Sequence, residues 1–231
     1  NIVAVNMSLG DDNVSGRYLN QACSNEINTL SSMGIATVIA AGNDRGYGVA
    51  SPANNSPNAI VVGSVDARNV LANHSNRHPN LVDIYALGTQ VPVATITGGI
   101  DRYNGTSLAA PQVAGAFASL QEASVNLIGR KIGPAEFLGL ANASGDNGRG
   151  IYGDKVINVD RLIERFVESR LPSNPDIPTI LAGFDEVFYL ANNPDVFRAM
   201  TSGALTSAVG HFNANGWREH RDPNEFFDVF Y

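Results

Sequence analysis

The sequence is poor in three features that would otherwise define its class. Its single cysteine, Cys23, excludes an intrachain disulfide, and we expect it to fill space on a buried helix face rather than to react. No apolar run approaches the roughly 20 residues of a membrane-spanning helix, and runs such as 35–41 and 59–63 have the length of buried strands. Basic side chains are also few, with 15 Lys and Arg against 22 Asp and Glu and a net charge of −7. The sequence therefore predicts no membrane and no nucleic acid as partner.

Strand and helix patterns alternate along the first 170 residues. Residues 2–7 and 35–40 indicate strands on either side of a helix at 18–33, and this βαβ unit predicts a parallel sheet and an α/β fold class. Further elements are expected as strands at 60–65, 81–86 and 91–96, a short strand within 148–159, and helices at 106–126, from Pro134 and at 160–168. The first strand is apolar enough to be central in its sheet, and the chain has no initiator Met. We therefore expect natural sequence to precede residue 1.

A proline-rich segment, 171–179, divides the chain and indicates a stiff linker. It separates a predicted domain at 1–170 from a small, mostly helical module at 180–231. The module repeats an aromatic pattern at a spacing of 42 residues: Phe184, Val187, Phe188 and Tyr189 recur as Phe226, Val229, Phe230 and Tyr231. Such a period is typical of helical repeat units, so the chain is expected to stop at the start of a second unit.

The Ser107 hydroxyl lies in a segment typical of a catalytic nucleophile. Residues 105–115 read Gly-Thr-Ser-Leu-Ala-Ala-Pro-Gln-Val-Ala-Gly, which puts Ser107 where a Gly-rich loop turns into an Ala-rich helix with free backbone N–H groups. A serine also needs a base for its proton and donors for the oxyanion that forms. Asn43 ends a buried strand at the carboxyl edge of the predicted sheet, where such sheets build sites, and its amide can supply one donor. Taken alone, a Gly-Asn pair is more typical of an ordinary turn, so a turn residue is the alternative.

Four segments together resemble the subtilisin-like serine peptidases in order and spacing: 6–10, 40–43, 57–66 and 105–115. The resemblance runs from residue 1 to about 168 and implies the C-terminal part of a three-layer, parallel-sheet catalytic domain that is incomplete at its N-terminus. It implies that Ser107 is the nucleophile of a serine endopeptidase and Asn43 the oxyanion donor. It further assigns a set of substrate-binding residues, namely Ser8, Leu9 and Gly10 beside the extended substrate and Ala41 and Gly42 in the pocket for the residue before the scissile bond.

Two positions depart from the family pattern, because Gln112 stands where members usually have His and Leu87 where they usually have Pro. The Asp and His of the triad would lie upstream of the matched segments, in contexts that this chain lacks. His74 and His78 fall in a polar loop and are expected to be solvated.

Three explanations stay open for the incomplete triad: an active enzyme of which this is a part, a chain completed by a separate N-terminal piece, or an inactive relative. The chain alone is expected to be nearly inactive. Its expected partners are a polypeptide substrate and the missing N-terminal part of the same domain.

Two rival functions remain. Gly105-Thr-Ser107-Leu-Ala109 approximates the nucleophile elbow of α/β-hydrolases, which would pair Ser107 with His211 and one of Asp146, Asp154 or Asp160. No buried strand directly precedes Ser107, which argues against this interpretation. The other rival is a catalytically inactive, peptidase-like scaffold in an exported binding or adhesion protein.

The tail resembles short helical repeats of exported bacterial proteins, so the resemblances together imply an extracellular or cell-surface location. Its aromatics, Phe188, Tyr189, Phe212 and Trp217, are expected to form a small core, with a glycan- or partner-binding surface as the alternative. His211 and His220 are expected on helix surfaces or as caps. No cofactor is required by the proposed chemistry. Calcium is common in the peptidase family, but no segment shows a ligand spacing for it or for another metal.

Overall fold

The computed structural model describes residues 2–10, 21–152, 155–169, 184–216, 219 and 221. The chain divides into two compact units, one of Asn1–Gln121 with Lys131–Leu162 and one of Glu122–Arg130 with Ile163–Tyr231. Several predicted features lie outside the described residues, namely the linker 171–179, the second aromatic repeat at 226–231, Trp217, His220 and Asp154. The two units are therefore described one at a time.

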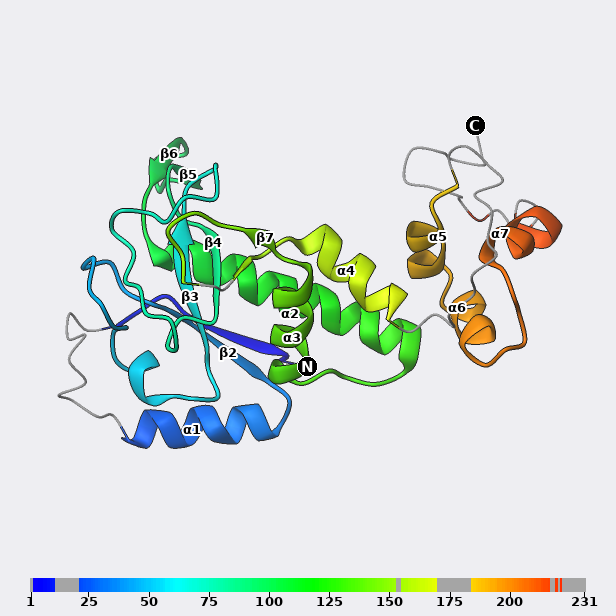
Figure 1. Cartoon of the computed structure of the whole chain (residues 1–231), viewed down its shortest axis with the longest axis horizontal. Coiled ribbons are helices and arrows are strands. Elements are labelled where there is room, and N and C mark those ends of the chain that lie inside the picture. Colours follow the sequence, from blue (N-terminus) through cyan, green and yellow to red (C-terminus); the bar gives the residue numbers. More distant parts are fainter. Residues whose placement is uncertain are drawn as a thin grey trace. The chain divides into compact units, whose positions relative to one another are not determined.

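A six-stranded sheet forms the centre of the first unit (Figure 1). Its order is β1 (Ala4–Met7), β2 (Ala36–Ala40), β3 (Ile60–Val65), β4 (Ile84–Leu87), β8 (Lys155–Val156) and β7 (Asp146–Asn147). All neighbouring pairs from β1 to β8 are parallel, and only β7 with β8 is antiparallel. Every residue of β2 and β3 is buried, as expected for parallel strands covered on both faces.

Helices cover both faces of this sheet. Side chains alternate along a strand, so Ile39, Val61 and Tyr85 share one face, and they belong to the same core cluster as Ile27 of α1 (Gln21–Ser32). Cys23 of α1 is half-buried and packs against that cluster. The opposite face carries other buried side chains, and α2 (Thr106–Ile128) contributes a buried stripe that includes Val113, Phe117 and Leu120. Figure 1 shows α1 and α2 on opposite sides of the strands, which makes the unit a three-layer α/β structure.

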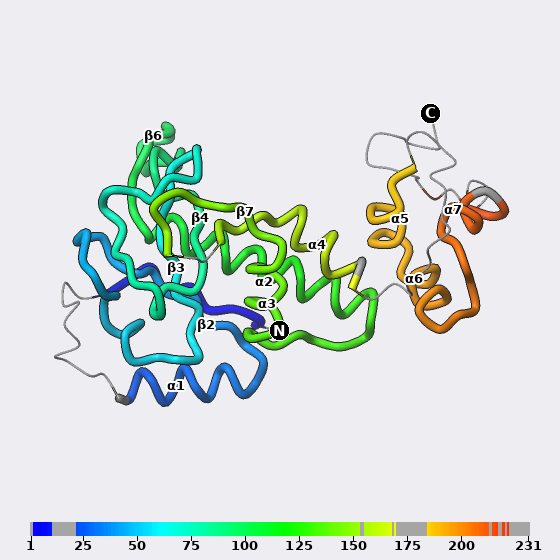
Figure 2. The backbone as a smooth tube through the Cα atoms, viewed as in Figure 1, coloured from blue at the N-terminus to red at the C-terminus, as the bar shows by residue number. Residues whose placement is uncertain are grey.

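The remaining elements are shorter. A hairpin of β5 (Val91–Ala94) and β6 (Ile100–Tyr103) forms a separate antiparallel sheet, so the predicted strand at 91–96 exists but lies outside the main sheet. The other elements are η1 (Ala53–Asn55), α3 (Pro134–Ser144) and α4 (Val159–Glu168). Figure 2 traces two long connections, residues 41–59 between β2 and β3 and residues 66–83 between β3 and β4.

The second unit contains α5 (Glu186–Asn192), α6 (Pro194–Thr201), α7 (Ala208–His211) and the π-helical turn η2 (Phe212–Gly216). Tyr189 is fully buried, and its ring lies 5.2 Å from that of Phe184 and 5.6 Å from that of Phe212. The Tyr189 hydroxyl forms a hydrogen bond of 3.0 Å with Nδ1 of His211. His211 is the last residue of α7, so it lies at a helix end and contacts this aromatic group. For Tyr189 the core interpretation therefore holds.

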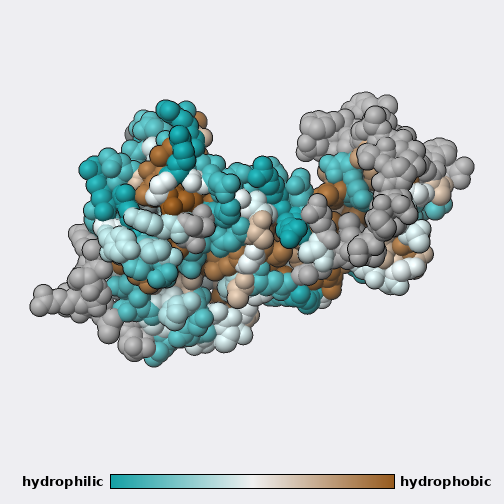
Figure 3. Space-filling model, viewed as in Figure 1, coloured by the Kyte–Doolittle hydropathy of each residue, from teal (hydrophilic) through white to brown (hydrophobic). Residues whose placement is uncertain are grey.

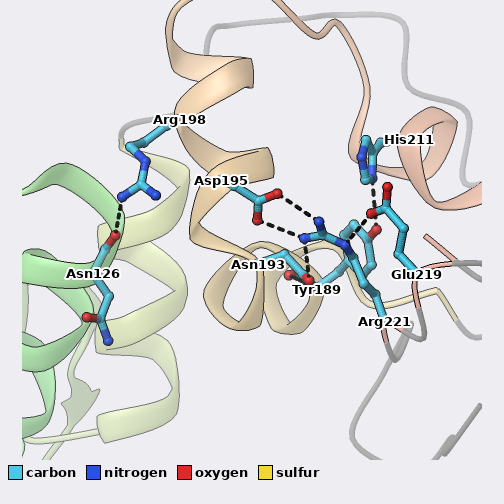
Figure 4. A network of polar contacts seen from close by, with 8 residues as sticks. All are labelled: Asn126, Tyr189, Asn193, Asp195, Arg198, His211, Glu219 and Arg221. Carbon is cyan, nitrogen blue, oxygen red and sulfur yellow. Dashed lines mark hydrogen bonds and ion pairs between the residues drawn. The ribbon is translucent and has the colours of Figure 1, made fainter. Parts of the chain in front are cut away.

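A polar network joins the helices of the second unit (Figure 4). Arg221 donates to both carboxylate oxygens of Asp195, at 2.7 and 2.8 Å, and to Oδ1 of Asn193 at 2.9 Å. The hydrogen bonds from Arg221 lower the pKa of Asp195 to about 2. A forked pair of this kind orders two segments that are far apart in the sequence.

The described surface in the view of Figure 3 is mostly hydrophilic, with smaller apolar patches between polar side chains. Within the described ranges, none of the helices has both the length and the apolar character that a membrane crossing requires. Those ranges also hold no group of three or more His, Cys, Asp or Glu placed to bind a metal ion.

Candidate functional site

Ser107 is the second residue of α2, directly after the turn that leads into the helix. It is half-buried, and its carbonyl oxygen accepts a hydrogen bond of 2.7 Å from the hydroxyl of Ser8. This contact ties the segment after β1 to the start of α2, two regions 99 residues apart in the sequence. Among the described residues neither the hydroxyl nor the N–H of Ser107 has a hydrogen-bond partner. Both groups are therefore available to a ligand.

Asn43 is held beside Ser107 through the intervening residue, Thr106. The Oδ1 atom of Asn43 accepts from the backbone N–H of Thr106 at 2.9 Å and from its hydroxyl at 3.1 Å. The same hydroxyl oxygen accepts from the N–H of Gly42 at 3.2 Å. A backbone N–H can only donate, so the Asn43 oxygen must face Thr106 and its NH₂ group must point the other way.

Gly105 shows where the two free donors lie. A Cβ atom added to this glycine would be 3.7 Å from Nδ2 of Asn43 and 3.7 Å from the backbone nitrogen of Ser107. Both N–H groups, which have no partner among the described residues, thus lie 3.7 Å from one point beside Gly105, and Oδ1 of Asn43 lies 3.9 Å from it. An oxyanion site requires this arrangement, donors fixed in advance around the place where negative charge develops.

A pocket of about 190 Å³ opens at these groups. Its walls include six residues that the sequence assigned to catalysis or substrate binding: Ser8, Leu9, Gly10, Gly42, Asn43 and Ser107. Small residues continue the lining, Ala40 and Ala50 among them. A Cβ at Gly10 would approach that of Ala50 to 2.9 Å, so this wall has no room for a larger residue at position 10. The walls therefore suit a narrow, extended ligand.

Ala41 lies elsewhere. Its side chain is fully buried in the core cluster that also holds Ile39 and Val61, and it does not line the pocket. Side-chain direction alternates at the end of β2, so Ala40 rather than Ala41 faces the ligand side. The assignment of Ala41 to substrate binding therefore stays a prediction, and Ala40 is the residue of this pair that lines the pocket.

A second hollow, of about 570 Å³, shares Asn43 with the pocket. Its lining includes Arg45, His74 and Thr89. His74 was expected to be solvated, but it is half-buried, and its Nε2 atom is buried without a hydrogen-bond partner among the described residues. This burial, with the charge of Arg45 as a second cause, lowers the pKa of His74. The imidazole is therefore neutral at pH 7.

Two of the other candidate acids and bases are engaged elsewhere. His78 is half-buried, accepts from the N–H of Asn80 at 3.2 Å and packs against the ring of Tyr47 at 4.9 Å. Asp146 pairs with Arg161 at 2.6 Å. The α/β-hydrolase interpretation gave Asn43 no role, whereas the structure places Asn43 and Ser107 at one pocket.

Asp83 carries a strongly perturbed carboxyl group outside this pocket. It precedes β4 and accepts a hydrogen bond of 2.8 Å from the N–H of Val61. Burial raises its pKa to about 6. Asp83 lines a different hollow, of about 260 Å³ near η1, and does not belong to the Ser107 pocket.

Two residues that hold the site in place were missed at the sequence level. Thr106 is fully buried and orients Asn43, and its position next to Ser107 is a signal that could have found it. Asn76 is also fully buried, yet it sits in a polar loop whose composition predicts exposure. Gln112 and Leu87, the two residues that depart from the family pattern, contact each other. Nε2 of Gln112 donates to the carbonyl oxygen of Leu87 at 2.6 Å.

Comparisons with known proteins identify the family of the chain. The subtilase family model matches residues 1–136. The alkaline proteinase of Hapsidospora chrysogena is 39% identical over 127 residues, which are 52% of this chain and 29% of that protein. Subtilisin amylosacchariticus of Bacillus subtilis subsp. amylosacchariticus is 36% identical over 122 residues, 51% of this chain and 30% of that protein. A solved structure of a cold-adapted subtilisin-like serine proteinase matches with a TM-score of 0.55 and 27% identity, over 67% of this chain and 52% of that one.

The chain spans less than a third of the length of these two curated relatives. They come from a fungus and from a bacterium, so they do not restrict the source of this chain to bacteria. The family model covers more than half of the chain, and the solved relative shares its fold. The chain therefore belongs to the subtilase family, the subtilisin-like serine proteases.

Proposed function

We propose that this chain forms part of a serine endopeptidase in which Ser107 attacks the peptide carbonyl and Asn43 binds the resulting oxyanion. The observation that carries the proposal is the pair of available donors, Nδ2 of Asn43 and the N–H of Ser107, which both lie 3.7 Å from the position that a Cβ of Gly105 would take. Thr106 holds the first donor in orientation and the start of α2 supplies the second. The free Ser107 hydroxyl lies at the same pocket.

The reaction is acyl transfer. The Ser107 oxygen bonds to the scissile carbonyl carbon while its proton passes to the imidazole of a His, which an Asp orients. The negative charge on the carbonyl oxygen is stabilised by Asn43 and the Ser107 N–H. Collapse then breaks the C–N bond, the leaving amine takes the proton from the imidazole, and water later hydrolyses the acyl-enzyme. We propose that sequence upstream of residue 1 supplies this Asp and His.

The pocket supports a polypeptide substrate. Residues 8–10 form one wall without belonging to a strand, so their backbone is available to pair with an extended peptide. Gly42, Ala40 and Ala50 leave space for the side chain before the scissile bond. The proposal requires no cofactor, and it includes an extracellular or cell-surface location, in line with the relatives named alkaline proteinase and subtilisin.

Labelling with a serine-directed phosphonate tests the proposal. The protein extended by its natural upstream sequence is expected to react at Ser107, as located by mass spectrometry of the labelled peptide, and to hydrolyse a denatured protein substrate. Ser107→Ala should abolish both signals. A folded, extended protein whose Ser107 stays unlabelled would contradict the peptidase function and support an inactive, peptidase-like scaffold instead.

A further inference from the structure

Asn76 is a buried carboxamide placed against the loop that carries Asn43. It belongs to the connection between β3 and β4, and its residue is fully buried. Its Nδ2 donates to the carbonyl oxygen of Ala41 at 3.0 Å. Its Oδ1 accepts from the N–H groups of Asp44 and Gly46, both at 2.9 Å. One side chain thus satisfies three backbone groups that no regular secondary structure would pair.

These contacts bracket Asn43 on both sides. The backbone N–H of Asn76 adds a fourth, to the carbonyl oxygen of Gly42 at 2.9 Å, so the contacted positions are 41, 42, 44 and 46. Gly42 has a φ of +102°, and a Cβ there would come within 2.3 Å of Nδ2 of Asn76. The carboxamide is therefore packed directly against the backbone that precedes Asn43.

The loop needs such an external support. Arg45 also adopts a positive φ, of 58°, which a residue other than glycine takes up only when its surroundings impose it. From the opposite side, Thr106 contacts Gly42 and Asn43. The oxyanion donor is accordingly held between two buried polar side chains, Thr106 at the start of α2 and Asn76 in the β3–β4 connection.

We propose that Asn76 is a positioning residue for catalysis, which fixes the 41–46 loop so that Nδ2 of Asn43 is aimed at the oxyanion before substrate binds. This inference rests on the proposed function. Asn76 does not line the Ser107 pocket, so it acts through Asn43 and not through the substrate. A donor set in place in advance has no reorganisation to undergo during the reaction, and small displacements of such groups reduce turnover strongly.

The role requires asparagine specifically. The contacts need a donor and an acceptor on one short, planar group, and an amide supplies both. Asn76→Asp keeps the size and the acceptor for Asp44 and Gly46 but replaces the donor to Ala41 by an oxygen. Asn76→Ala removes all three side-chain contacts, so the N–H groups of Asp44 and Gly46 lose their acceptor, whereas the Ala41 carbonyl keeps its bond from the N–H of Ala50.

A double-mutant cycle with Asn43 tests the inference in the extended protein. We expect Asn76→Asp to lower kcat by about 10- to 100-fold, with KM changed by less than about threefold, because a misplaced oxyanion donor affects the transition state more than the ground state. In the Asn43→Ala background, Asn76→Asp should change kcat by no more than about twofold, because the donor it positions is already absent. Asn80→Asp, an exposed substitution in the same connection, serves as the matched control and should leave kcat unchanged.

Active-site titration with the phosphonate gives the concentration of folded, reactive enzyme, so that kcat is calculated per active molecule. Where Asn76→Asp does not fold, Asn76→Ser, which keeps a small donor and acceptor, replaces it in the cycle. Equal kcat for wild type and a folded Asn76 variant would overturn the inference, and so would full additivity with Asn43→Ala. A folded, extended wild type that neither labels nor hydrolyses overturns the proposed function together with this inference, whereas a labelled wild type with an unaffected Asn76 variant overturns the inference alone.

Discussion

Replacing Asp83 by Asn should stabilise the first unit above pH 6 and lose that effect in acid. The native carboxyl has a pKa of about 6, raised by burial from the ordinary value of 3.8. Above pH 6 the group is ionised in both the folded and the unfolded chain, and the fold bears the full cost of burying the charge. As the pH falls from 6 to 3.8 the folded protein takes up the proton first, so the cost shrinks and then disappears.

The size of this effect follows from the two pKa values. Their difference corresponds to about 3 kcal/mol at 1.36 kcal/mol per pH unit. The carboxamide that Asp83→Asn introduces would keep an oxygen to accept the N–H of Val61, now bonded at 2.8 Å, without the charge. Its new NH₂ group would face the hollow near η1, where the amides of Asn54 and Asn55 also have groups without partners among the described residues. We expect a gain of about 1 to 3 kcal/mol at pH 8, reduced by any unpaired donor.

Urea unfolding of wild type and Asp83→Asn at pH 4, 5, 6, 7 and 8 measures this directly. The difference in unfolding free energy should be largest at pH 7 and 8 and fall toward pH 4, where both side chains are neutral in the folded state. Acid pH is thus an internal control for effects of the substitution other than charge. A difference that stays constant across this range, or one that grows toward acid, would refute the reasoning.

Three further substitutions probe the site itself. Asn43→Ala should reduce kcat by about 100- to 1,000-fold with little change in KM, as measured by peptide hydrolysis, because it removes one oxyanion donor. Thr106→Val keeps the backbone donor to Asn43 but loses the hydroxyl that contacts both Asn43 and Gly42, so kcat should fall by about tenfold and the melting temperature should also fall, because the Gly42 N–H loses its acceptor. Gly42→Ala places a Cβ 2.3 Å from Nδ2 of Asn76 at a φ of +102°, and calorimetry should show a destabilisation of about 2 kcal/mol or more. Unchanged kcat in Thr106→Val or an unchanged melting temperature in Gly42→Ala would contradict these contacts.

Local sequence signals located Ser107 and Asn43, because each sits at a junction with a clear pattern. A Gly-rich loop before an Ala-rich helix marks Ser107, and a polar residue after an apolar strand marks Asn43. The same patterns predicted α1, α2, β2 and β3, since burial on both faces of a sheet leaves continuous apolar runs. These features depend on residues that are close together in the sequence. The first strand was expected to be central, but β1 is half-buried and stands first in the order of the described sheet.

Features that depend on long-range packing were not predictable in this way. The burial of Asn76 follows from backbone groups at 41–46, which are 30 or more residues away, and nothing in its polar surroundings indicates it. His74 was misjudged for the same reason, because its exposure is set by the connections that enclose the second hollow. The strand at 91–94 was found, but its partner is β6 and not the main sheet, a choice that alternation of apolar residues does not decide.

The loop between β2 and β3 has a consequence for protein engineering. Its conformation depends on hydrogen bonds with Thr106 and Asn76 and on backbone contacts with His74 and Arg77, which all belong to other parts of the chain. Transplanting the Ala-Ala-Gly-Asn motif into another scaffold would therefore transfer the Asn43 amide without the contacts that orient it. A designer who wants the proposed oxyanion site must transfer five cooperating positions, 42, 43, 76, 106 and 107, as one unit.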